Sequence, residues 1–163
     1  MLSEIVGRCE VHHQSLDSAL VWFRRDLRAE DNAALHHALK AARRVWCVFV
    51  YDTEILAALP RADRRVEFIH ASVTDLNRQL ECLAAAHGRD QVRLIVRHGL
   101  AAEEIPRLAK TLGVQAVYIN RDDEPAAIRR DAKVHDSLSS VGVAVYSCKD
   151  HVIFERSEIL TGG

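Results

Sequence analysis

The chain has 163 residues, a length that fits one compact domain. Hydrophobic residues make up 48% of it and charged residues 28%, the balance of a globular protein rather than of a disordered or fibrous one. The formal net charge of -1 argues against a surface devoted to nucleic acid, because such surfaces concentrate lysine and arginine. No apolar run approaches the roughly 18 residues of a membrane span, and residues 1–18 lack the apolar core of a signal peptide. We therefore expect a cytoplasmic protein that does not enter membranes.

Residues 1–18 show no sustained hydrophobic period, and we expect them to form a loosely ordered extension ahead of a domain that spans 19–149. Within this domain, five short runs are rich in β-branched and aromatic residues and are apolar almost throughout. That pattern is typical of strands covered on both faces in a parallel sheet. The predicted strands are 19–23, 45–51, 92–96, 114–119 and 143–147.

The segments between these runs have helical spacing. In the clearest of them, Val66 to Leu83, six apolar residues recur at intervals of three and four, and Gly88 is expected to end the helix. Asp31 is predicted to cap the helix that follows the first strand, and Gly113 to end the helix before the fourth. Pro125 suits the first turn of the last helix, where its missing amide costs nothing.

Strands and helices thus alternate along the whole domain. Right-handed crossovers then predict a doubly wound α/β fold, a Rossmann-like five-stranded parallel sheet with helices on both faces. In such sheets ligands bind outside the carboxyl ends of the strands, near the point where strand order reverses. Functional residues are therefore expected directly after the strands.

Several common motifs are missing. The first strand-to-helix turn, residues 23–32, contains no glycine, and no G-x-x-x-x-G-K-[ST] sequence occurs, which argues against NAD and ATP sites. There is no G-x-S-x-G elbow and no H-E-x-x-H pattern among the nine histidines. The four cysteines lie far apart without metal-ligand spacing, so we predict no metal site and expect Cys47 and Cys148, inside apolar runs, to be buried and unreactive.

The sequence LVWFRRDLR at 20–28, followed by DNAAL at 31–35, closely resembles the opening signature of DNA photolyases and cryptochromes. Further similarity runs in the same order at 65–69, 96–99 and 120–125. The tail at 150–163 resembles the start of the linker that joins the two domains of this family.

The resemblance implies that the chain is the amino-terminal domain of a longer protein. In the family, a helical second domain holds FAD and receives ultraviolet-damaged DNA, and that domain is expected to be absent from this chain. The parent would be a deoxyribodipyrimidine photolyase, a carbon-carbon lyase that reverses cyclobutane pyrimidine dimers by electron transfer from reduced FAD. A cryptochrome blue-light sensor is the alternative. This chain would contain no catalytic residue and would be inactive by itself.

The family's first domain docks against the helical domain and, in many members, seats a light-harvesting antenna chromophore. The residues expected to contact such an antenna are Arg24, Asp52, Asn120, Asp122 and Glu124. A second set is expected to fix the first turn or to contact the helical domain: Arg25, Asp26, Arg28 and Asp31. For both sets a purely structural role remains open, as ion pairs within the turn for the first-turn residues and as helix capping for Asp122 to Glu124.

The antenna itself is expected to be a deazaflavin or a flavin rather than methenyltetrahydrofolate. Some folate-binding members carry an Asn-Glu pair where this chain has Ala126 and Ala127. A free-standing nucleotide-binding protein of the universal-stress type would have a similar sheet. It is a weaker alternative, because such proteins usually carry a glycine-rich phosphate loop after the fourth strand, where this chain reads NRDD at 120–123.

Overall fold

The computed structural model describes residues 15–60, 62–90 and 92–150. Its five strands are all parallel and form one sheet in the order β3-β2-β1-β4-β5, as predicted. Strand order therefore reverses between β1 and β4. The strands are β1 (Leu16–Phe23), β2 (Ala42–Asp52), β3 (Ile95–Gly99), β4 (Ala116–Asn120) and β5 (Ala144–Cys148). The segments 1–14 and 151–163, expected to be an extension and the start of a linker, lie outside the described residues.

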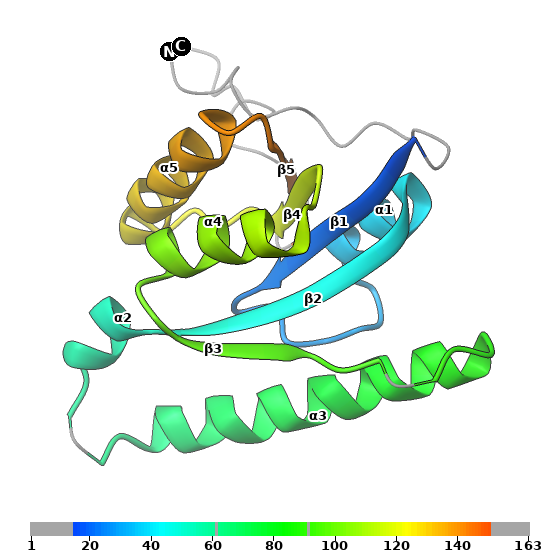
Figure 1. Cartoon of the computed structure of the whole chain (residues 1–163). Helices are drawn as coiled ribbons and strands as arrows, with labels where there is room; N and C mark the ends of the chain where they lie inside the picture. The colour runs from blue at the N-terminus through cyan, green and yellow to red at the C-terminus, as the bar shows by residue number, and fades with distance from the viewer. Residues whose placement is uncertain (1–14, 61, 91, 151–163) are drawn as a thin grey trace, which may run out of the picture.

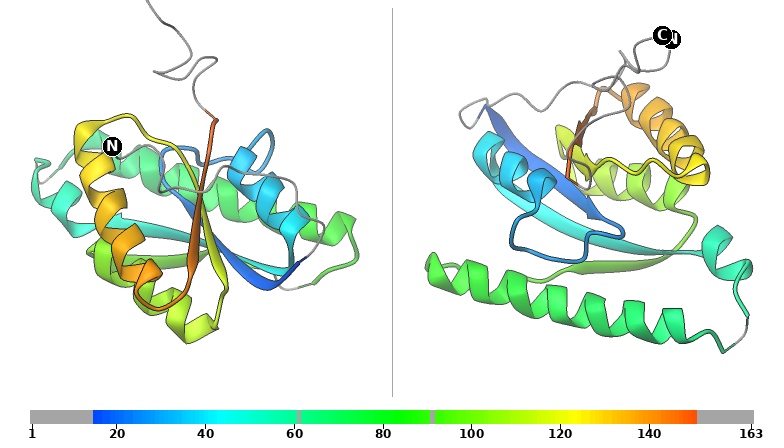
Figure 2. Two further views of the ribbon diagram at one scale, coloured as in Figure 1. Left: turned by 90° about the horizontal axis from the view of Figure 1, so that it is seen from above. Right: turned by 180° about the vertical axis from the view of Figure 1, so that it is seen from behind.

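Helices cover both faces of this sheet, which confirms the doubly wound fold (Figures 1 and 2). One face carries α1 (Ala33–Ala41) and the long α3 (Arg64–Ala86), which follows the β3 edge, while the other carries α4 (Ala101–Leu112) and α5 (Pro125–Ser139). A short helix that the sequence did not indicate, α2 (Thr53–Ala57), follows β2.

Neighbouring strand residues enter different cores. Leu20 packs with Ile105 and Leu138 beneath α4 and α5, whereas Val21, next to it, packs with Leu35 beneath α1. Successive side chains of a strand point to opposite faces, and both faces are covered. This is why the central strands are apolar at nearly every position rather than at every second one.

Three strands begin three residues away from their predicted positions. β1 starts at Leu16 and β2 at Ala42, each three residues before the predicted strand, because the two strands already pair there. β3 covers Ile95–Gly99 instead of 92–96. It lies at the edge of the sheet and pairs only with the carboxyl half of β2, so its polar residues Arg97 and His98 are exposed. Because these residues are polar and exposed, they lack the continuous apolar pattern of strands that are buried on both faces.

The predicted helix ends are right with one exception. Gly113 ends α4 in the left-handed conformation, with φ 62°, and Pro125 is the first residue of α5. The prediction that Asp31 caps α1 is wrong, because the cap is Asn32, whose side-chain oxygen accepts the N–H of Leu35. Asp31 occupies the turn before it, with φ 48°. An amide can cap the helix with its oxygen and donate elsewhere with its nitrogen, which a carboxylate cannot do.

The long helix α3 is anchored by only part of its apolar stripe. Val73, Leu76 and Leu80 are buried against the sheet, whereas Leu83 is exposed. Phe68, in the amino-terminal half, exposes 74% of its surface. The helix is therefore held mainly by its middle and by residues toward its carboxyl end.

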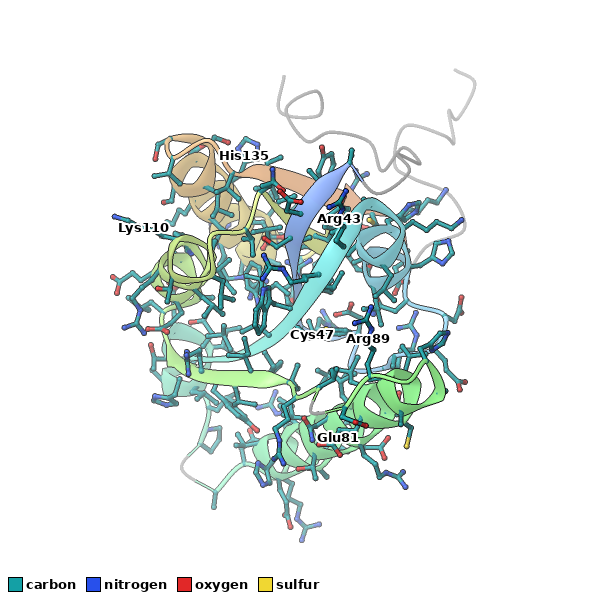
Figure 3. All side chains as sticks on the ribbon, turned by 45° about the vertical axis from the view of Figure 1, so that its right-hand side comes forward. Arg43, Cys47, Glu81, Arg89, Lys110 and His135 are labelled. Carbon is teal, nitrogen blue, oxygen red and sulfur yellow. The ribbon has the colours of Figure 1, made fainter. Side chains whose placement is uncertain are left out.

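Cys47 and Cys148 are buried, as predicted. Burial disfavours the charged thiolate and raises the pKa of Cys47 to about 12, so this thiol, on β2 in Figure 3, is unreactive at neutral pH. Among the described residues, no helix combines the length and apolarity that a bilayer crossing requires.

Two substitutions on α3 test this anchoring. Leu76→Ala removes a fully buried side chain and is expected to lower the free energy of unfolding by about 2–5 kcal/mol. Phe68→Ala, two turns away on the same helix, is expected to change it by less than about 0.5 kcal/mol. Urea denaturation followed by circular dichroism measures both, and similar losses for the two variants would contradict the proposed anchoring.

Candidate functional site

A buried carboxylate organises the turn after β1. Asp26 exposes only 3% of its surface, and its Oδ1 accepts the backbone N–H of Arg24 at 2.9 Å. Its Oδ2 accepts the side-chain amides of Asn32 at 3.0 Å and of Asn120 at 2.6 Å. Because Asn120 is the last residue of β4, these bonds tie the turn to the neighbouring strand across the reversal of strand order.

We call the hydrogen-bonded residues around Asp26 the Asp26 network. It also caps the amino terminus of α1. The first three amides of a helix have no partner within the helix and form a natural binding place for phosphate. Here three side chains from three segments accept all of them: Asp150 accepts Ala33 N–H at 3.0 Å, Asn120 accepts Ala34 N–H at 2.8 Å, and Asn32 accepts Leu35 N–H at 3.0 Å.

This capping has a direct consequence for ligand binding. In nucleotide-binding Rossmann folds the pyrophosphate lies on the amides of the first helix, next to a glycine-rich turn. The turn at 23–32 has no glycine, and the amides at 33–35 already have internal acceptors. A dinucleotide therefore does not fit this chain in the usual position.

Arg24 also forms its side-chain contacts inside the domain. Its side chain exposes only 6%, and its Nη1 contacts Asp131 Oδ2 of α5 at 2.5 Å. Its Nη2 donates to the carbonyl oxygen of Asn120. Arg24 thus joins the ends of β1 and β4 to α5, and its hydrogen-bonding groups face protein partners rather than solvent.

Arg28 fixes the other side of the turn. Its guanidinium donates to the carbonyl oxygen of Asp31 at 2.7 and 3.1 Å and to Asp150 Oδ2 at 2.7 Å. Asp150, whose side chain is 3% exposed, therefore connects the residues after β5 to both the turn and α1. Asp26 and Arg28 both form hydrogen bonds within the turn, while any contact of theirs with a second domain stays a prediction.

A second group of charges lies at the same edge of the sheet, and two of its three members, Arg25 and Glu124, are exposed to solvent. Arg25 exposes 68% of its side chain, and its Nη1 lies 3.2 Å from Glu124 Oε2 and 3.9 Å from Asp122 Oδ1. Asp122 Oδ1 also accepts the N–H of Glu124. We call these three residues the edge triad. An exposed pair such as Arg25 and Glu124 contributes only about 0–1 kcal/mol, so these two side chains can exchange their mutual contact for a ligand at little cost.

The five residues predicted to contact an antenna thus fall into different environments. Arg24 and Asn120 are buried partners in the network, and Asp52 caps α2 by accepting the N–H of Glu54 at 3.0 Å. Asp122 and Glu124 stand beside Arg25, which was expected to serve the turn. The structure therefore places Arg25 with the two acids and Arg24 with the turn.

Sequence reasoning missed three residues of the network: Asn32, at the position after the predicted cap, and the two acids Asp131 and Asp150. Asp131 gives a recognisable signal, because the core-facing positions of α5 are Ala127, Val134 and Leu138, and a residue at 131 continues their spacing of three and four. A charged residue in that register indicates a buried partner. Asp150 gives no such signal, since it follows the last strand outside any periodic element.

Comparison with known proteins agrees with this architecture. Residues 19–163 match the family model of DNA photolyase. The chain belongs to the DNA photolyase family. Within it, the chain is 30% identical over 143 residues to a deoxyribodipyrimidine photo-lyase of a Synechococcus species, covering 88% of this chain and 28% of that protein. It is 32% identical over 139 residues to cryptochrome-2 of Gallus gallus, covering 85% and 23%. The chain thus spans about a quarter of the length of these relatives.

Solved structures of the photolyase family share the fold. An archaeal photolyase from Sulfolobus tokodaii, described as having two FAD molecules with the implication of a novel light-harvesting cofactor, superposes with a TM-score of 0.76 at 30% identity. The match covers 88% of this chain and 32% of that one. The α/β domain described here therefore corresponds to part of a larger photolyase fold.

The importance of the Asp26 network can be measured by substitution. Asp26→Ala leaves three donors of a buried turn without their acceptor, and we expect the free energy of unfolding to fall by about 3 kcal/mol. Asp31→Asn is the control, because asparagine tolerates the left-handed conformation and the side chain is exposed. Chemical denaturation compares the two, and an Asp26→Ala variant as stable as Asp31→Asn would contradict the role given to Asp26.

Proposed function

We propose that this chain is the amino-terminal domain of a light-dependent DNA repair photolyase and that its edge triad helps to hold a flavin-type antenna chromophore. The observation that carries this proposal is the division of the polar residues at the carboxyl edge. Three of them are buried and hydrogen-bonded to one another: Asp26, Asn32 and Asn120. Arg25 and Glu124, by contrast, remain exposed beside Asp122.

The chemistry of the triad supports a flavin or deazaflavin. Carboxylates accept hydrogen bonds from hydroxyl and ring N–H groups, and a guanidinium donates to carbonyl or phosphate oxygens. Such a chromophore would bind Asp122 and Glu124 through its donors and Arg25 through its acceptors. The similar photolyase from Sulfolobus tokodaii, with its two FAD molecules, supports a flavin as the light harvester.

A folate antenna has less support. Ala126 offers only a methyl group to solvent, and Ala127 is buried in α5 against the core. Neither can supply the polar contacts that an Asn-Glu pair would make at these positions.

The catalytic chemistry would belong to a second domain. In this proposal a helical domain of the same protein holds the catalytic FAD, binds damaged DNA, and docks on the α/β domain. Because the chain covers about a quarter of its photolyase relatives, most of such a protein lies outside it. A cryptochrome is the second candidate, since similarity to cryptochrome-2 of Gallus gallus is as high as similarity to the photolyase.

Antenna binding can be tested on the chain itself. Titration with flavin mononucleotide, a hydroxylated deazaflavin and methenyltetrahydrofolate, followed by fluorescence anisotropy, is expected to show saturable binding of the flavin or the deazaflavin but not of the folate. Glu124→Gln combined with Asp122→Asn is expected to weaken this binding about tenfold, because charged acceptors become neutral.

The control is Asp136→Asn, which makes the same change at an exposed position of α5. It is expected to leave the affinity unchanged. Binding of folate alone, or equal loss of affinity in the control and the triad variants, would contradict the assignment.

The proposal that catalysis belongs to a second domain gives a separate expectation. With added FAD, a reductant and near-ultraviolet light, the chain alone is expected to leave thymine dimers in an oligonucleotide intact, as measured by chromatography. It is also expected to purify without stoichiometric flavin. Dimer reversal by this chain would show that the catalytic groups lie within it.

A further inference from the structure

Trp22 lies near the end of β1 and is 2% exposed. The guanidinium carbon atoms of Arg24 and Arg130 lie over its ring, 5.2 and 5.1 Å from the ring centroid. Asp131 contacts both guanidiniums, at 2.5 Å and 3.4 Å. The indole therefore lies against two positive charges that share one carboxylate.

The hydrogen bonds of Arg130 do not explain its position. Among the described residues, its Nε is buried without an acceptor, and its contact with Asp131 is long. A buried N–H group without a partner is unfavourable, and such groups are rare in folded proteins. What Arg130 gains in this position is the contact with the face of the indole.

Two cations over an indole change its electron-donating ability. A guanidinium is attracted to the negative face of the neutral ring. If the indole loses an electron it becomes positive, and the same guanidiniums repel it across a poorly screened interior. Asp131 balances only one of the two positive charges, so the remaining net positive charge beside the ring disfavours loss of an electron from Trp22.

We propose that Arg24 and Arg130 prevent Trp22 from quenching a light-excited chromophore at the carboxyl edge of the sheet. Without them, Trp22 would give one electron to the excited chromophore, which would be reduced by one electron. The electron would then return to the indole and the excitation would be lost as heat. The presence of the chromophore rests on the proposed function, whereas the protected state of Trp22 is a property of this chain alone.

The property can be measured with free riboflavin as the photo-oxidant. The chain has two tryptophans, and Trp46, which is 38% exposed, is first replaced by phenylalanine. Laser flash photolysis under nitrogen then gives the rate constant with which Trp22 reduces excited riboflavin. A variant that also carries Trp22→Phe supplies the background from tyrosines.

In this background, Arg130→Met keeps most of the side-chain stem but removes the charge, and we expect the rate constant to rise at least about fivefold. Arg130→Lys retains the charge and is expected to stay within about twofold of the parent. Arg129→Met, an exposed neighbour on α5, serves as the matched control and is expected to have no effect.

Two outcomes would overturn the inference. One is an unchanged rate in a folded Arg130→Met variant, or equal rates for the methionine and lysine variants. The other is a rise that merely follows the accessibility of Trp22 to acrylamide, a neutral quencher that does not respond to charge. Because riboflavin is free in solution, neither result depends on antenna binding, so failure here is distinct from failure of the proposed function.

Discussion

The hydrogen bonds of the Asp26 carboxylate hold together the part of the sheet where strand order reverses. One oxygen fixes the backbone of the turn after β1, and the other holds the amides of Asn32 and Asn120. Those amides turn their oxygens toward α1 and cap it. A single buried carboxylate, satisfied by three donors, thus sets the start of α1 and its position relative to β4.

This arrangement also decides which ligands the edge of the sheet can accept. In many Rossmann folds the crevice at the strand reversal binds phosphate through free helix amides. Here those amides are satisfied by the protein, so the family fold keeps its topology without the dinucleotide site. In the proposed function, ligand contacts come from side chains further out, those of the edge triad.

Arg24 and Arg25 show how adjacent, identical residues acquire different roles. Arg24 reaches Asp131 and packs against Trp22, on the face covered by α4 and α5. Arg25 extends into solvent beside Glu124. The first arginine contributes its charge to the interior, where screening is weak, and the second to the surface, where its contacts are exchangeable.

The sequence was enough to predict the order of strands and helices, a core on each face of the sheet, the end of α4 and the start of α5. Hydrophobic periodicity, glycine and proline determine these features because each acts on the backbone over a few residues. The family resemblance likewise rested on contiguous residues such as 20–28. Neither could separate Arg24 from Arg25 or reveal Asp150 as a partner of α1. Those assignments depend on contacts between segments about 90 to 120 residues apart, which exist only once β1, β4 and the residues after β5 lie side by side.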